Sequence, residues 1–249
     1  MQSNIPSTSS ILRTLLRADF TTQWRNRRSV IMMVLIPVII LISWKPIVSK
    51  LGGPFVISTC ITLGLNAIGL MGYSTSIARD RDKGVFQRIR VAPLPTWTIM
   101  TSRLMVQLAM ILIVTSAVFI VGYSYDKIFI QPIGYVLGFV SALVGGALYL
   151  GLGQAIVGLV KNAETVNATA RLVYFVFIMV GMFGELGMLG DVVSKAVHWS
   201  PYGTVKRIVA DSIVPSSWTM TSTYALLVTI GYAIVFAALG IKKFKWNNK

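Results

Sequence analysis

Side chains able to carry covalent chemistry are scarce in this sequence. It holds one histidine, His198, one cysteine, Cys60, and eight aspartates and glutamates. A nucleophile works only with a base held beside it, and no G-x-S-x-G segment, Ser/His pattern or pair of carboxylates suggests that arrangement. One histidine and one cysteine also make no zinc-type ligand cluster. We therefore expect no catalytic residue, no metal site and no cofactor bound by this chain.

A nucleotide-binding loop is missing from the sequence as well. ATP-binding loops follow the pattern G-x-x-x-x-G-K-[ST], because their backbone amides hold the phosphates. No Gly-Lys dipeptide occurs anywhere in the 249 residues. If the protein uses ATP, a partner must hydrolyse it.

The composition indicates a membrane protein. Hydrophobic residues make up 55% and charged residues 12%, against roughly 25% charged residues in soluble domains. Such a chain is neither a soluble enzyme, nor a disordered protein, nor a disulfide-stabilised domain. A membrane span needs about 20 apolar residues, and six segments qualify. These predicted spans are about 29–48, 54–78, 98–122, 133–160, 166–183 and 221–241.

The elements around the spans follow from the same patterns. Residues 1–28 are expected to form a polar tail and a basic amphipathic helix in the membrane interface, and 29–249 a six-span domain. The stretch 184–219 is too short for two crossings and too apolar for an open loop. We interpret it as an outer region of short re-entrant helices between spans 5 and 6.

The basic residues are unevenly distributed. The formal net charge is +15, and the chain has 23 lysines and arginines. If the N-terminus is cytoplasmic, 17 of the 23 fall on inner segments, which is a strong positive-inside signal. It predicts a multi-pass protein of the cytoplasmic membrane with both termini inside, and it explains the charge without nucleic acid. The six outer cations are Lys45, Lys50, Lys127, Lys195, Lys206 and Arg207.

The inner loop 79–95 is the most informative segment. Its charges alternate, a glycine follows, and Val85, Phe86 and Ile89 fall on one face of a short helix that Pro93 and Pro95 end. A solvated positive-inside loop would explain its arginines. It would not explain an apolar face with an aromatic residue at the membrane edge, which needs a partner.

The loop resembles the coupling helix of ABC type-2 transporter permeases. The basic amphipathic helix, the six spans and the segment Trp199-Ser200-Pro201-Tyr202 before the last span are similar to that family too. The family usually has glutamates where this chain has Asp80 and Asp82, and asparagine in place of Ser200. The resemblance assigns docking on an ATPase to Asp80, Asp82, Gly84, Val85, Phe86, Arg88 and Ile89.

The resemblance also implies a fold, partners and a function. The fold is an all-α integral membrane protein with an outer re-entrant hairpin. The partners are an ATP-binding cassette subunit, which holds ATP and Mg, a second copy of this permease or a paralogue, and the lipid bilayer. The function is export of a drug, peptide, lipid or glycan across a bacterial cytoplasmic membrane.

Several polar and aromatic residues are candidates for a translocation path, each with a simpler alternative. A polar stripe on span 2 could face a pathway or bond a neighbouring helix. Aromatic residues on span 5 could line a route or pack against lipid. An acid at membrane depth is a functional candidate, or it lies in water at the outer interface. Arg171, near the inner start of span 5, is better explained by snorkelling. The candidates are Thr59, Thr62, Asn66, Tyr73, Tyr174, Phe177 and Glu185.

Two other classes of protein compete with a permease. One is an intramembrane enzyme, a protease or acyltransferase, which the missing nucleophile–base pattern disfavours. The other is an ion channel, for which no selectivity filter or charged ring is visible. Co-purification of an ATPase subunit would favour the permease over both.

Overall fold

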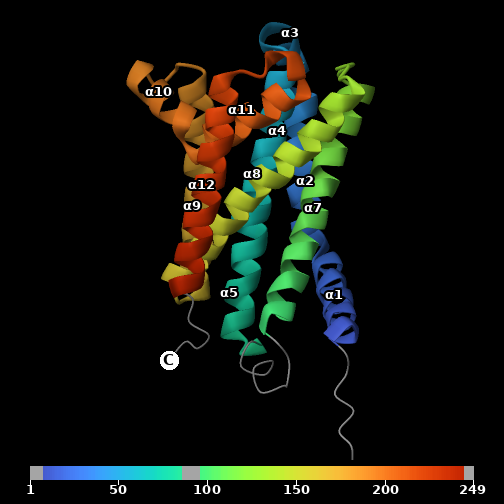
Figure 1. The fold of residues 1–249 in the computed structure, drawn as a ribbon, viewed down its shortest axis with the longest axis vertical. Helices are drawn as coiled ribbons and strands as arrows, with labels where there is room; N and C mark the ends of the chain where they lie inside the picture. Colours follow the sequence, from blue (N-terminus) through green and yellow to red (C-terminus); the bar gives the residue numbers. More distant parts are fainter. Residues whose placement is uncertain (1–7, 86–95, 244–249) are drawn as a thin grey trace, which may run out of the picture.

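A computed structural model describes residues 8–85 and 96–243, and within those ranges every regular element is helical (Figure 1). The elements in chain order are α1 (Thr8–Arg25), α2 (Arg27–Ser43), α3 (Lys45–Leu51), α4 (Gly53–Asn66), the π-helix η1 (Ala67–Ser74), α5 (Thr75–Asp82), α7 (Thr96–Ser124), α8 (Pro132–Leu159), α9 (Ala163–Glu185), α10 (Asp191–Trp199), α11 (Pro201–Ile213), the 3₁₀ turn η2 (Pro215–Ser217) and α12 (Met220–Lys243).

The membrane-spanning helices agree with the apolar segments of the sequence. Five helices of the described chain are long and apolar enough to cross a bilayer: Gly53–Asp82, Thr101–Ser124, Pro132–Leu159, Ala163–Glu185 and Met220–Lys243. The first of these runs through α4, η1 and α5 without a break. The pair α2 and α3 counts as a sixth span if the two helices cross together. The prediction of an all-helical, multi-span chain is confirmed.

The first span differs from the straight helix over 29–48 that its hydropathy predicts. Helix α2 ends at Ser43, α3 begins at Lys45, and the two are bent by 65°. Pro46 lies at the start of α3. Because proline has no N–H and its ring clashes with the preceding turn, it cannot continue the hydrogen-bond ladder of α2. The chain therefore turns at Trp44.

Local caps determine where the later helices begin. The Asn162 side chain accepts hydrogen bonds from the backbone N–H groups of Glu164 and Thr165, at 2.7 and 3.4 Å, and starts α9. Ser200 caps α11 in the same way by accepting from Gly203 N–H at 3.2 Å, with Pro201 at the first helical position. Both arrangements satisfy backbone donors that a helix start leaves unpaired.

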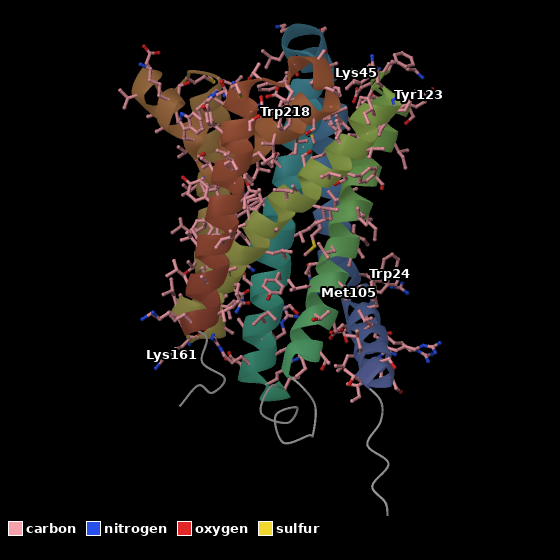
Figure 2. All side chains as sticks on the ribbon, viewed as in Figure 1. Trp24, Lys45, Met105, Tyr123, Lys161 and Trp218 are labelled. Carbon is pink, nitrogen blue, oxygen red and sulfur yellow. The ribbon has the colours of Figure 1, made fainter. Side chains whose placement is uncertain are left out.

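The helices form one bundle, and the start of α1 and the end of α12 lie at the same end of it but on opposite sides in this view (Figure 1). Lys45 and Trp218 lie at the opposite end of the bundle from Lys161 (Figure 2). Helix α8 runs obliquely through the bundle and packs against α12, η1 and α11. The protein core lies along α4 and η1, where residues such as Ile57, Ile61 and Leu65 are almost fully buried.

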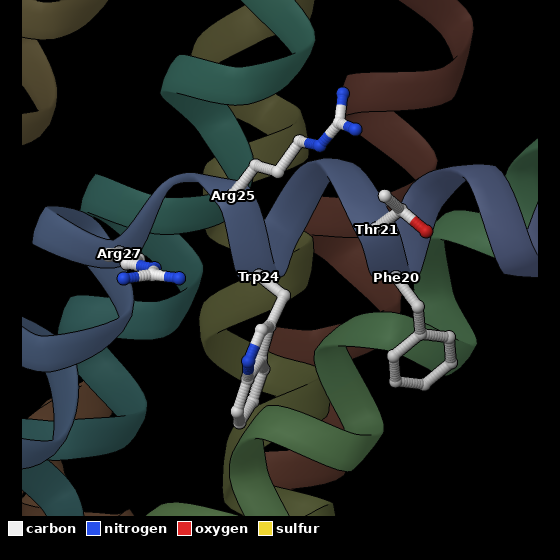
Figure 3. Close-up of a pocket in the computed structure, with 5 residues that line it drawn as sticks. All are labelled: Phe20, Thr21, Trp24, Arg25 and Arg27. Atoms are coloured by element: carbon white, nitrogen blue, oxygen red, sulfur yellow. The ribbon is translucent and has the colours of Figure 1, made fainter.

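Helix α1 packs along the half of α7 that lies at the Lys161 end of the bundle. We call this end inner and the opposite end outer after the charge distribution of the sequence, and the orientation itself stays a prediction. Ser102 Oγ donates a hydrogen bond of 2.6 Å to the Asp19 carboxylate and links the two helices. Phe20 and Trp24 extend from one side of α1, and Arg25 extends from the other (Figure 3). Trp24 is 62% exposed, which suits an aromatic anchor at a membrane surface. That α1 lies in the interface stays a prediction.

The outer region contains two short helices, α10 and α11. Gly187 and Gly190 have φ of +73° and +86° in the turn before α10, a backbone region open to glycine at little cost. Gly181 and Gly184 remain inside α9, where a Cβ atom would lie 2.6 Å from the Tyr202 ring and 2.7 Å from Val197. The first two glycines of this stretch thus allow α11 and α10 to pack closely on α9, and the last two form the turn. That α10 and α11 re-enter the membrane stays a prediction.

Candidate functional site

The inner end of α5 is held on two sides by charged residues. Asp80 forms an ion pair of 2.5 Å with Arg103 near the start of α7. Arg81 is 4% exposed. Its guanidinium donates to the carbonyl oxygens of Val157, Val160 and Lys161, at 2.8, 2.8 and 2.5 Å. These carbonyls belong to the last turn of α8 and the residues just after it, where a cation is favoured by the helix dipole.

The predicted coupling surface begins at this anchored end. Lys83 and Gly84 turn the chain out of α5, and Gly84 has a φ of +66°. Asp82 is exposed, and Val85 is half-buried. Phe86, Arg88 and Ile89, which carry most of the predicted apolar face and its flanking charge, lie outside the described residues.

The polar stripe on α4 and η1 lies inside the bundle. Thr59, Thr62 and Asn66 are fully buried and Tyr73 is 4% exposed. Tyr73 donates a hydrogen bond of 2.8 Å to Gln154 Oε1 on α8, with both groups buried. Tyr73 thus bonds a neighbouring helix, and whether the stripe borders a path stays a prediction.

Some of the buried polar groups lack a hydrogen-bond partner among the described residues. Those on or near the stripe include Thr62 Oγ1, both amide atoms of Asn66 and the Tyr149 hydroxyl. Asn66 is the last residue of α4, directly before the π-helix. π-helical segments are rare, and those that occur are frequent at functional sites. The stripe thus has buried polar atoms without a described hydrogen-bond partner near the middle of the span Gly53–Asp82.

The other three path candidates lie apart from the stripe. Phe177 meets the Tyr149 ring edge-on, with ring centroids 6.3 Å apart. Glu185, at the end of α9, forms an ion pair of 2.5 Å with Lys206 on α11. Tyr174 instead lines an inner cavity. The structure therefore distributes the seven candidates over four different environments.

The Glu185–Lys206 pair is an unusual outer feature. The Lys206 side chain is 3% exposed and that of Glu185 28%, and the lysine nitrogen lies 3.2 Å from the centroid of the Phe55 ring. Burial lowers the pKa of Lys206 to about 8, although the charge of Glu185 opposes this. The ion pair and the contact with the Phe55 ring hold α11 against α9 and α4. Removing one partner of such a pair typically costs 3–5 kcal/mol.

The inner cavity has a volume of about 450 Å³ and was not predicted. It lies between the α1–α2 junction, η1, α5 and the first half of α9. Arg79, Lys83 and Arg171 line it together with Asp80 and with neutral polar and apolar residues. None of the four stripe residues lines it, because the face of η1 that borders the cavity carries Ala67, Met71 and Gly72 instead.

Sequence patterns could not have shown this cluster. Arg79 appears in the sequence as part of a charged loop, and Arg171 as a snorkelling residue at the start of a span. The two lie 92 positions apart, and only the packing of α5 and α9 on η1 brings them to one cavity. Their common signal is basic charge at inner helix ends, which positive-inside topology produces in any case.

Cys60 and His198, the two side chains best able to take part in catalysis, are held by packing and by a contact with a neighbouring residue. Cys60 is a fully buried free thiol in the core. A ring nitrogen of His198 contacts the guanidinium of Arg207, and burial followed by the charge of Arg207 lowers the pKa of His198. Among the described residues no group of three or more His, Cys, Asp and Glu could hold a metal ion.

Helices long and apolar enough to cross a bilayer define a multi-span membrane protein. The chain matches the family model of the ABC-2 type transporter over residues 11–205 and belongs to that family. It is 21% identical over 145 residues to a protein of Bacillus subtilis (strain 168) named "Putative transport permease YvfS". The match covers 58% of this chain and spans about half, 55%, of that relative.

Proposed function

We propose that this chain is the membrane-spanning permease of an ATP-driven exporter whose ATP is hydrolysed by a separate subunit. Membership of the ABC-2 family supports the transporter part. The observation that carries the coupling part is the anchoring of α5. Asp80 and Arg81 hold its inner end on α7 and α8, so a force applied to residues 83–95 reaches three helices at once.

The proposal includes the partners and cargo of the complex. An ATP-binding cassette subunit would hold ATP and Mg, since this sequence has no phosphate-binding loop. A second permease copy or a paralogue would complete the pathway. The cargo would be a drug, peptide, lipid or glycan that leaves across the cytoplasmic membrane.

The orientation in the membrane is part of the proposal and can be measured. The positive-inside distribution places the end with Lys161 in the cytoplasm, and α3 belongs to the opposite end (Figures 1 and 2). In a Cys60→Ser chain, a cysteine at Lys50 should react with an impermeant thiol reagent in intact cells. A cysteine at Lys161 should react only after lysis. Labelling of residue 161 from outside would invert the topology.

The coupling role is tested with Phe86→Ala. Truncation of a buried aromatic anchor costs about 2 kcal/mol or more, or roughly thirtyfold in affinity. The variant should insert in the membrane, but recovery of the ATPase subunit and transport should fall. Arg88→Ala should do less, and its effect should shrink at high salt because rim charges are screened.

A matched control is available at the other end of the molecule. Phe129 is 78% exposed, so Phe129→Ala removes an aromatic ring from the outer side and should leave assembly unchanged. The permease, reconstituted with its ATPase, is assayed for complex recovery, ATP hydrolysis and transport. If Phe86→Ala equals the parent in all three, residues 83–95 are only a connecting loop and the coupling proposal fails.

A further inference from the structure

The inner cavity is built from elements that are distant in sequence. Helices α2 and α9 both pack on η1, which contributes the lining between them. The deep lining is apolar and includes Met33 and Ala67, both almost fully buried. Ile36, Met71 and Tyr174 extend this apolar lining along three different helices.

The rim of the cavity carries an excess of positive charge. Arg79, Lys83 and Arg171 are exposed cations from α5, its C-terminal turn and α9. Among the described residues of the lining, the one carboxylate belongs to Asp80, and it is already paired with Arg103 at 2.5 Å. Three cations that share one partly enclosed space repel one another, and a bound anion would relieve that repulsion.

The neutral polar residues of the lining also favour an anionic ligand. Gln23 Nε2 is buried and has no hydrogen-bond acceptor among the described residues. The amides of Asn26 and Asn167 line the cavity beside it. A buried N–H donor is normally satisfied, and the phosphate or carboxylate oxygen of a ligand in the cavity would provide an acceptor for it.

We propose that this cavity binds an amphiphile with an anionic headgroup, taken up from the inner leaflet. The headgroup lies between Arg79 and Arg171 and accepts from Gln23, while its apolar tail follows Met33 and Tyr174 toward the lipid. This inference rests on the proposed function, because it makes the cavity the place where a transporter receives its cargo. It selects acidic amphiphiles from the broader set of drugs, peptides, lipids and glycans.

The probe is radiolabelled dodecyl phosphate, measured by equilibrium dialysis against the full chain in phosphatidylcholine nanodiscs, with empty nanodiscs as background. Arg79→Gln/Arg171→Gln removes two rim charges and should weaken binding about tenfold or more, since each lost charge-assisted bond is a strong one. Arg13→Gln/Arg17→Gln is the matched control. It removes the same charge from exposed positions of α1 that do not line the cavity, and it should change affinity less than about twofold.

Competing ligands test whether the anionic headgroup and the apolar tail are both needed for binding. Unlabelled dodecyl phosphate should displace the probe, whereas inorganic phosphate, dodecyl maltoside and dodecyltrimethylammonium should not at equal concentration. Displacement by inorganic phosphate would reduce the site to a free-anion site, and displacement by dodecyl maltoside to an apolar one. Either result overturns the proposal, as does equal weakening in both double variants.

Folding and function are controlled separately. Arg79→Lys/Arg171→Lys keeps the charge and should retain most of the binding, which a folding defect would not allow. Binding is measured without ATP or a partner subunit. Failure to bind therefore overturns only this inference, whereas failure of Phe86→Ala to affect the complex overturns the coupling proposal and leaves the binding result standing.

Discussion

Arg81→Gln is expected to lower the free energy of unfolding by about 3 kcal/mol, because it leaves buried carbonyl groups without their charged donor. The three acceptors, on Val157, Val160 and Lys161, end α8 and lead into α9. In the complex, ATP hydrolysis should continue while transport is lost, since the movement of α5 no longer reaches α8. Thermal unfolding followed by tryptophan fluorescence measures the first effect, and reconstituted transport the second.

Two further variants make this result specific. Arg81→Lys keeps the charge but has no planar fork that reaches three carbonyls, so its loss should be intermediate. Arg17→Gln removes an exposed cation of α1 and should melt like the parent. The anchoring role of Arg81 is wrong if Arg81→Gln also melts like the parent and transports normally.

The second large effect is expected at the contact of η1 with α8. A Cβ atom at Gly69 would overlap the carbonyl group of Tyr149, and one at Gly153 would overlap the Gly69 oxygen. Because the obstacles are backbone atoms, the helices must separate. Gly69→Ala should therefore destabilise the protein by about 3 kcal/mol, at the upper end of ordinary overpacking. It should also weaken the nearby Tyr73–Gln154 bond.

Gly231 on α12 provides the control for the same chemical change. A Cβ atom there would meet no heavy atom of the described chain within 4 Å, apart from its chain neighbours and the backbone of its own helix. Gly231→Ala should leave the melting temperature unchanged or raise it slightly, because alanine favours the helix. Equal melting of the Gly69 and Gly231 variants would show that η1 and α8 are not held at backbone contact.

The sequence by itself determined the class of the protein. Low charge, six apolar segments and an uneven lysine and arginine distribution led to an all-helical membrane chain, and the order of its motifs led to the ABC-2 family. These properties follow from each segment alone, because burial of a span in lipid depends on its own length and hydropathy. The start of α9 at a capping asparagine is equally local.

Only the tertiary structure decided which side of each helix faces protein. The stripe through Asn66 and Tyr73 has the same pattern whether it lines a path or packs on α8, and only the packing shows that Tyr73 bonds Gln154. Glu185 gained its partner from α11, and Arg81 its acceptors from α8.

The inner cavity has the same origin. Arg79 and Arg171 meet there because η1 lies between α5 and α9. In lipid, apolar segments resemble one another, so hydropathy says where helices cross but little about which faces meet. Close glycine contacts and buried hydrogen bonds make that choice, and they exist only between segments distant in the chain.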